Sequence, residues 1–280
     1  MNGRRIRRSG LSLGWRSAVL AVVLATVGSM TAQGAVIRGD ELALGSVVFD
    51  SSWLWNGEVV EWRVVHNDYS GAPAGSVTLM ATESIAARQL NSGWNNRWSE
   101  STMRDYLNAD FYDEFSTIFK SIVQETDVSW AISDPQTPPG SGVTTDRVFL
   151  ASRTELGGTE LAGDGQLLDW FDHADAADRR ADVSGPANYW TRTGESRVYD
   201  SVTYDLSAYY VSTTTGAFST GAWVTDALGT VPVINIRGDA EFIAHESGSF
   251  QLIPEPGTIG LLLGAGGLVA VLRRRRKRSV

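Results

Sequence analysis

The chain has 280 residues, with 24 basic and 32 acidic side chains, a formal net charge of −8, and no cysteine. The missing cysteine excludes disulfides, zinc sites built on thiolates and a thiol nucleophile. The basic residues gather at the two ends, so residues 36–253 hold only 13 of them against 31 acidic residues, a formal charge of −18. A body this acidic argues against nucleic acid, or any anionic polymer, as an electrostatic partner.

Residues 1–35 are typical of a secretory signal. Five arginines precede the apolar stretch Ala18–Val27, and small residues follow. This order of charged, apolar and cleavage regions predicts export, with the mature chain starting near Ala35. The Arg7-Arg8 pair leaves twin-arginine export open, and an uncleaved N-terminal anchor is the other alternative.

Three strands are predicted next. They cover Gly45–Phe49, Val59–His66 and Val77–Ala81. In the second, apolar side chains alternate with more polar ones, which indicates a strand with one wetter face. Asn56-Gly57 is a favourable hairpin turn, so we expect an antiparallel meander.

The hydrophobic period then changes to that of helices. Ser99 is a candidate cap for a first helix, in which Met103 and Leu107 lie four residues apart. A second helical stretch, Phe111–Ile122, places its apolar residues on one face. The composition of Ser133–Thr145 predicts a loop.

A strand is predicted at Val148–Ala151, and β-structure returns near the C-terminus at Tyr189–Thr193, Tyr209–Thr213, Ala222–Thr225 and Val231–Ile236. Strands, two helices and strands again predict a single α+β domain with antiparallel sheets. At residues 36–253 the body is long enough to bury one core.

The segment Gly157–Pro186 is rich in acidic residues, with one short helix expected at Gln166–His173. Its aspartates are Asp164, Asp169, Asp172, Asp175, Asp178 and Asp182. A spacing of about three makes a solvated acidic face the first interpretation. A calcium site and a catalytic carboxylate pair remain as alternatives, although the spacing does not match an EF-hand loop.

Six sequence blocks occur in an order that resembles the bacterial domain of unknown function 6273 family. They are Gly45-x-x-x-Phe49, Glu61–Val65, Trp98-x-x-Ser101-x-x-Arg104-x-Tyr106-Leu107-Asn108-x-x-Phe111, Asp146–Leu150 with Ser152 and Glu155, Tyr189–Thr193, and Pro232–Ile236. Val231 and Met103 depart from residues common in the family. The Trp190-Thr191-Arg192-Thr193 block and the closing strand are also similar to C-type-lectin-like domains, which implies that fold and assigns no activity.

Ten tryptophans are available for packing or for binding. Trp62 and Trp98 lie on amphipathic patterns and are expected in the core. Exposed aromatic faces stack on sugar rings, so Trp94, Trp190 and Trp223 are candidate ligand-binding residues. Arg104 and Arg192 are expected to pair internally with carboxylates.

The last residues form a three-part tail. Pro254-Glu255-Pro256 precedes the uncharged segment Gly257–Leu272, sixteen residues that span about 24 Å as a helix and so make a marginal membrane span. The positive-inside rule predicts that a terminal basic cluster stays cytoplasmic, and this cluster is Arg273, Arg274, Arg275, Arg276, Lys277 and Arg278.

This tail resembles the PEP-CTERM sorting signal of Gram-negative bacteria. The resemblance implies recognition of Pro254, Glu255 and Pro256 by an exosortase-type transpeptidase, transient anchoring in the inner membrane, and then release or attachment at the cell surface. It also implies association with exopolysaccharide and biofilm. A plain membrane anchor is the alternative.

No catalytic constellation is evident in the sequence. The three histidines, His66, His173 and His245, have no metal-ligand spacing, and no nucleophile elbow or phosphate loop is present. We therefore expect a non-enzymatic surface or matrix protein that binds extracellular polysaccharide and needs no cofactor. An extracellular glycosidase with a carboxylate pair and a purely structural matrix protein are the alternatives.

Overall fold

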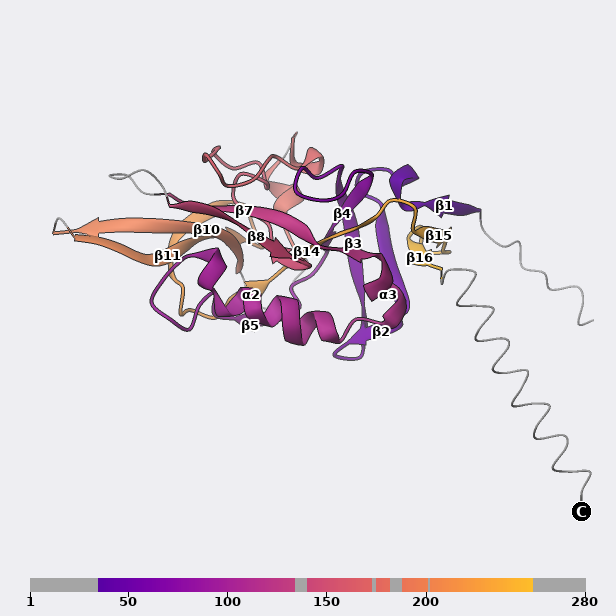
Figure 1. Cartoon of the computed structure of the whole chain (residues 1–280), viewed down its shortest axis with the longest axis horizontal. Coiled ribbons are helices and arrows are strands. Elements are labelled where there is room, and N and C mark those ends of the chain that lie inside the picture. Colours follow the sequence, from indigo (N-terminus) through magenta and orange to yellow (C-terminus); the bar gives the residue numbers. More distant parts are fainter. Residues whose placement is uncertain (1–34, 134–139, 173–174, 182–187, 201, 254–280) are drawn as a thin grey trace, which may run out of the picture. The chain divides into compact units, whose positions relative to one another are not determined.

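The computed structural model describes residues 35–133, 140–172, 175–181, 188–200 and 202–253 (Figure 1). The expected signal peptide and the expected transmembrane tail lie outside this part, apart from Ala35. Within the described ranges, no helix is both long and apolar enough to cross a membrane. The body beginning at Val36 forms one compact unit.

The first sheet has nine strands within the described residues. Eight follow the order β1-β15-β16-β2-β3-β4-β14-β6, and β9 also pairs with β14. Their bounds are β1 Val36–Arg38, β2 Val47–Trp55, β3 Glu58–Asn67, β4 Ser76–Ala81, β6 Val123–Gln124, β9 Val148–Leu150, β14 Pro232–Arg237, β15 Glu241–Ala244 and β16 Phe250–Leu252.

The predicted meander is confirmed as β2-β3-β4, all antiparallel. Asn56 and Gly57 make the turn between β2 and β3 with φ of 53° and 89°. Positive φ at both central residues matches the twist of the flanking strands, which is why this pair favours a hairpin. The strands at one end of this sheet, β1, β15 and β16, were not predicted, because each is too short to show a periodic pattern.

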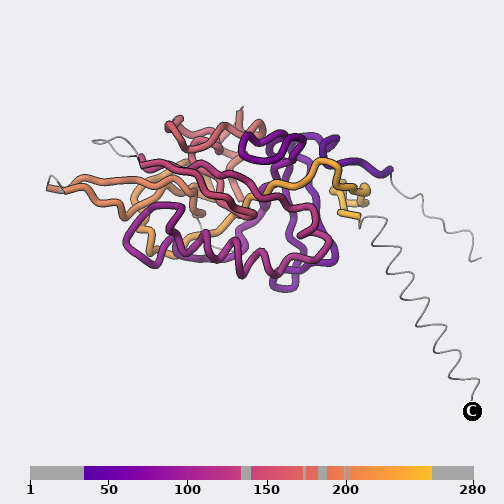
Figure 2. The backbone as a smooth tube through the Cα atoms, viewed as in Figure 1, coloured from indigo at the N-terminus to yellow at the C-terminus, as the bar shows by residue number. Residues whose placement is uncertain are grey.

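The second sheet has seven strands among the residues described. Five follow the order β12-β11-β10-β13-β5, while β7 pairs with β10 and β8 pairs with β7. Their bounds are β5 Ala86–Arg88, β7 Thr126–Ser133, β8 Ser141–Asp146, β10 Asn188–Tyr199, β11 Val202–Ser212, β12 Phe218–Trp223 and β13 Leu228–Thr230. Figure 2 follows β10 and β11, in orange, as a long two-stranded ribbon.

The helical segments are short. α2 covers Thr102–Tyr106 and runs into a π-helical turn, Leu107–Phe111, while α3 covers Thr117–Ile122. The other helical segments in the described residues are single 3₁₀ turns, at Gly39–Glu41, Trp98–Glu100, Asp169–Phe171 and Ala176–Arg179.

The cap predicted at Ser99 is wrong by two residues. Ser101 caps α2 by accepting the Arg104 N–H, and Ser116 caps α3 in the same way. Ser99 instead lies inside a 3₁₀ turn that precedes the cap. The helices present aromatic side chains to the first sheet, and the Trp53 ring lies 4.7 Å from that of Phe115.

The loop predicted at Ser133–Thr145 is partly wrong. Residues 134–139 are outside the described part, but Ser141–Asp146 form β8, paired antiparallel with β7. Composition misled here because Gly, Ser and Thr dominate this strand. β8 pairs only with β7 among the described strands, and four of its six residues are not buried, so few large side chains are needed to pack it.

The fold is mostly β, with two sheets and short helices. The α+β prediction gave the helices too large a share of the fold. The prediction of antiparallel sheets is also wrong in part, because both sheets contain parallel pairs. β10 runs parallel to β7 and β13, and β16 runs parallel to β2. The fold also brings the two ends of the body together, since β15 pairs with both β1 and β16.

Candidate binding surface

Two of the three tryptophans predicted to bind sugar present their rings to solvent. Trp94 is 67% exposed in the loop after β5, and Trp223, the last residue of β12, is 46% exposed. Trp190 is different, because it is 1% exposed and its indole N–H donates to the Arg88 carbonyl at 2.9 Å. Trp190 therefore packs in the core and offers no open ring face.

The Trp94 loop and the turn that follows Trp223 are joined by a hydrogen bond. The backbone N–H of Asn91 donates to the carbonyl of Val224 at 3.0 Å. Asn91 lies three residues before Trp94, and Val224 directly follows Trp223. The polar loop that carries Trp94 is thus hydrogen-bonded to the turn that directly follows Trp223.

Asparagine side chains hold the Trp94 loop. Asn91 accepts the Gly93 N–H through its Oδ1 at 3.1 Å. The buried Asn96 donates through its Nδ2 to the carbonyls of Glu195 and Ser207, at 2.9 and 3.1 Å. Asn and Asp side chains that bond nearby backbone fix such loops without regular structure. The loop is therefore tied to the β10–β11 ribbon below it.

The Trp223 turn is closed from its own side. The Trp223 N–H donates to the Asp226 carboxylate at 2.9 Å, and the Asp226 N–H donates back to the Trp223 carbonyl at 2.7 Å. Trp223 also pairs with Ser207 across the β11–β12 ladder. A further bond runs from Gln89 Nε2 to the Thr225 carbonyl at 2.7 Å. These bonds fix the backbone under both rings before any ligand arrives, which reduces the entropy cost of binding.

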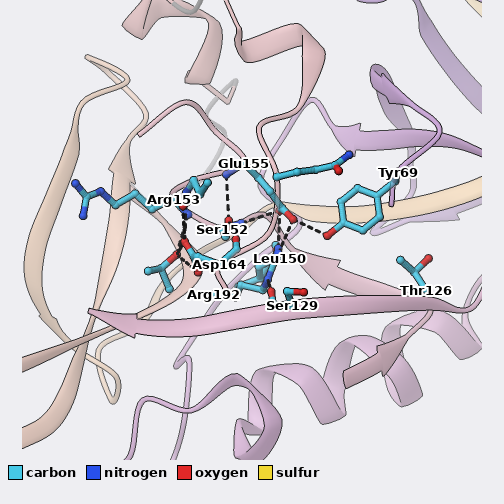
Figure 3. A network of polar contacts seen from close by, with 12 residues as sticks. Tyr69, Thr126, Ser129, Leu150, Ser152, Arg153, Glu155, Asp164 and Arg192 are labelled. Carbon is cyan, nitrogen blue, oxygen red and sulfur yellow. Dashed lines mark hydrogen bonds and ion pairs between the residues drawn. The ribbon is translucent and has the colours of Figure 1, made fainter. Parts of the chain in front are cut away.

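In the interior of the domain, Arg192 and Glu155 form a buried ion pair (Figure 3). Arg192 Nη1 donates to Glu155 Oε2 at 2.6 Å, and Nη2 donates to Oε1 at 2.5 Å. The Tyr69 hydroxyl donates to Oε1 at 2.6 Å, and the Ser152 N–H donates to Oε2 at 2.9 Å. Burial, together with the charge of Glu155, raises the pKa of Tyr69, which stays a neutral donor. The prediction that Arg192 pairs internally is confirmed.

Asp164 is buried in the same network. It accepts from the Thr193 hydroxyl at 2.8 Å and from the Thr154 hydroxyl at 3.2 Å. Burial raises the pKa of Asp164 to about 6, even though Arg192 and these hydrogen bonds oppose the shift. The solvated face expected for the acidic segment is therefore wrong at Asp164, which has no exposed surface.

A third buried carboxylate, that of Asp146, accepts hydrogen bonds from another set of donors. Arg104 Nε donates to Oδ1 at 2.6 Å, Trp98 Nε1 donates to Oδ2 at 2.9 Å, and the Thr144 hydroxyl donates to Oδ2 at 2.7 Å. Asn108 continues this network by donating to the Val148 carbonyl at 2.8 Å. Arg104 is thus paired internally, as predicted.

A family model described as domain of unknown function (DUF6273) matches residues 75–238, more than half of the chain. The chain belongs to the DUF6273 family. A second model, the PEP-CTERM protein-sorting motif, matches residues 252–277. No curated protein and no solved structure matches the chain.

The sorting match confirms the expected class of tail. It includes Pro254, Glu255 and Pro256 and most of the basic cluster, through Lys277. PEP-CTERM proteins are exported and sorted to the cell surface by an exosortase, so this protein is an exported exosortase substrate. These residues lie outside the described part of the structure, and their individual roles stay predictions.

The residue blocks that suggested the DUF6273 family build its interior. Trp98 and Arg104 meet Asp146, and Arg192 meets Glu155, across separations of about 40 residues. Glu155, Arg192, Trp98 and Asp146 are fully buried, while the Arg104 side chain is 25% exposed, so these contacts position strands within the domain. The exposed tryptophans are outside these blocks, and only their aromatic character in polar surroundings singled them out.

The two histidines in the described part of the DUF6273 chain each contact a polar side chain. His66, which is 7% exposed, places Nδ1 2.9 Å from Asp169 Oδ2, a contact that suits a structural role. His245 Nδ1 lies 3.1 Å from the Ser247 hydroxyl, while His173 is outside the described residues. Within the described part, no three His, Asp or Glu side chains converge on a metal position.

Two open grooves on the domain are large enough to hold part of a ligand. One, of about 590 Å³, is lined by Trp55 and Ser84 together with Glu58, Glu61 and Glu83. Another, of about 530 Å³, is lined by the loop that includes Gln166, Leu167 and Phe171, with Glu160 and Asp172 also present. The first brings carboxylates and an aromatic ring together, and no sequence pattern indicated it because its residues come from the β2–β3 hairpin and from the segment after β4.

Proposed function

We propose that this exported protein is a non-enzymatic binding module of the cell surface or extracellular matrix and that it binds extracellular polysaccharide. The observation that carries the proposal is the pair of exposed rings, Trp94 and Trp223, on segments joined by the Asn91–Val224 hydrogen bond. Aromatic side chains combine large apolar area with few rotatable bonds, so they contribute strongly to binding at low entropic cost.

Charge favours a neutral polysaccharide over an anionic one. The body carries a formal charge of −18, which repels uronate-rich or sulfated polymers at low ionic strength. Stacking of a sugar's apolar face on an indole ring does not depend on charge. We therefore propose that the ligand is a neutral polysaccharide and that its binding changes little with salt.

A binding assay with the processed protein purified from its host tests this function. The partners are polysaccharide fractions extracted from the same cells, and the readout is the bound fraction in a sedimentation or calorimetric experiment. We expect Trp94→Ala and Trp223→Ala each to weaken binding about tenfold, the effect of losing a typical aromatic hot spot.

The matched control is Tyr204→Ala, which removes an aromatic ring that is 39% exposed on β11. It should leave binding unchanged. Equal loss in all three variants, or no binding to any fraction, would reject the binding function and favour a purely structural matrix protein.

Glycoside hydrolysis is a second candidate, favoured by the 590 Å³ groove that carries Glu58, Glu61, Glu83 and Trp55. Two carboxylates on opposite sides of a bound sugar are the minimum for that reaction. Release of reducing ends from the same polysaccharides, abolished by Glu61→Gln or Glu83→Gln with folding intact, would establish it. No released sugar with the unaltered protein would remove this candidate.

We also propose that the body is C-type-lectin-like. The support is its Trp190-Thr191-Arg192-Thr193 strand, in which the arginine is fully buried, and its terminal strands β1 and β16, both paired with β15. An experimental structure whose strand order superposes on a lectin domain is the test. A different order would limit the resemblance to sequence blocks.

A further inference from the structure

The sorting motif begins inside the folded body. Its match starts at residue 252, and Leu252 is the last residue of β16. β16 is paired on both edges, with β15 through Phe242↔Leu252 and with β2 through Phe250↔Val48. The next residue, Ile253, still donates its N–H to the Glu241 carbonyl at 2.9 Å. The motif and the sheet therefore share residues.

A groove of about 330 Å³ opens at this junction, which we call the junction groove. Its apolar residues are Ile118 and Ile122 from α3, Ala240, and Leu252 and Ile253 from the motif itself. Its polar residues are Ser121, Arg237, Asp239 and Glu241. Ile118 and Ile253 remain half-exposed, whereas Ser121, Asp239 and Glu241 lie exposed at the rim.

The distance between this groove and the processing motif is set by covalent geometry. Pro254 follows Ile253 directly, and consecutive Cα atoms are about 3.8 Å apart. An enzyme that encloses Pro254, Glu255 and Pro256 must therefore come within contact distance of Ile253 and its neighbours. No spacer separates the folded body from the recognised peptide.

We propose that the junction groove is a docking face for the exosortase-type transpeptidase. The enzyme contacts the groove through an apolar segment that covers Ile118 and Ile253, flanked by polar groups that meet Ser121 and Glu241 at the rim. Asp239 is already paired with Arg237 at 3.0 Å. The body is then part of the substrate, and the tail alone is not the whole recognition element. The Leu252–Ile253 segment makes this face continuous with the peptide that the enzyme binds.

The first test fills the groove in the full-length chain expressed in its host. Ser121→Trp places a bulky ring at the exposed rim, and Ser70→Trp places the same ring at an exposed position in the β3–β4 loop, away from the groove. The readout is the fraction of chains that have lost the tail, measured by mass spectrometry. We expect that fraction to fall about fivefold for Ser121→Trp only, with thermal stability unchanged in both variants.

The second test inserts ten Gly and Ser residues between Ile253 and Pro254. A flexible insert of that length has a root-mean-square span of about 17 Å, which separates the motif from the groove. Docking predicts that the insert lowers the processed fraction and that Ser121→Trp has no further effect in the longer chain. Faster or unchanged processing with the insert, or equal processing of Ser121→Trp and the unaltered chain, would overturn the proposal.

Discussion

Arg192 and Glu155 form a two-pronged ion pair inside the protein, and neither side chain has any exposed surface. Burial of two charges is costly, and it is offset only when their remaining donors and acceptors are also satisfied. Here they are, because Tyr69 and Ser152 donate to the carboxylate while the Leu150 carbonyl accepts from the guanidinium. The pair fixes β10 against the segment that follows β9.

Removal of one partner should therefore be severe. Glu155→Ala leaves the Arg192 charge buried without a counter-ion, and we expect the free energy of unfolding to fall by about 3–5 kcal/mol. Urea denaturation followed by tryptophan fluorescence measures this change. The control is Glu160→Ala, which removes an exposed carboxylate from the same segment and should change stability by less than about 0.5 kcal/mol. Similar losses in both variants would mean that the pair is not a structural anchor.

The buried Asp164 should make stability depend on pH. Its pKa is raised from 3.8 to about 6 by burial, so the folded state binds this proton more tightly than the unfolded state does. The unfavourable contribution of its charge is complete above pH 6 and is relieved as the pH falls toward 4. Relative to Asp164→Asn, the wild-type protein should gain up to about 3 kcal/mol between pH 7 and pH 4.

Denaturation of both proteins at several pH values tests this, since the other carboxylates cancel in the difference. A constant difference between the two proteins across that range would contradict the shifted pKa. A difference of opposite sign would mean that the hydrogen bonds from Thr154 and Thr193 outweigh burial.

Gly45 should tolerate no side chain. Its φ is +84°, and a Cβ there would collide with the Trp170 ring. Gly45→Ala combines a left-handed backbone penalty with overpacking, so we expect a loss of about 2–5 kcal/mol in the free energy of unfolding. Gly57→Ala has a similar φ of +89° but open space around the Cβ, and it should cost only about 1–2 kcal/mol. Equal losses would show that the Trp170 contact is unimportant.

The tryptophans should divide into two classes when replaced by alanine. Trp94→Ala and Trp223→Ala remove exposed rings and should change stability by less than about 0.5 kcal/mol. Trp190→Ala removes a ring that is 1% exposed and should cost about 3–5 kcal/mol. Melting temperatures measured on all three variants distinguish the classes. A large loss at Trp94 would assign that ring to the fold and would weaken its proposed role in binding.

The meander and the aromatic helical segment were predictable because their signals are local. Period-2 alternation in β3 and the Asn56-Gly57 pair specify a hairpin from adjacent residues. The β8 strand was missed because its Gly, Ser and Thr residues also suit a loop. The cap at Ser101 was assigned to Ser99 because both are serines near the start of the same helical pattern, and only the bond to Arg104 distinguishes them.

The candidate site was predictable in part. Trp94 stood out as an aromatic residue in a polar loop, and its exposure agrees with that reading. Trp190 could not be separated from it by sequence, because a strand residue faces either the core or the solvent according to register. The link between the Trp94 loop and the Trp223 turn joins residues more than 130 positions apart, so no local pattern reports it.

The sequence by itself determined where this protein goes and what its interior requires. The exported destination follows from the contiguous sorting tail. The sequence also led us to expect that Arg104 and Arg192 pair with carboxylates inside the domain. Tertiary structure alone decided which carboxylates these are, which tryptophans remain open, and how close the sorting motif lies to the sheet. Those outcomes depend on contacts between distant segments, and such contacts exist only after strands from both halves of the chain have paired.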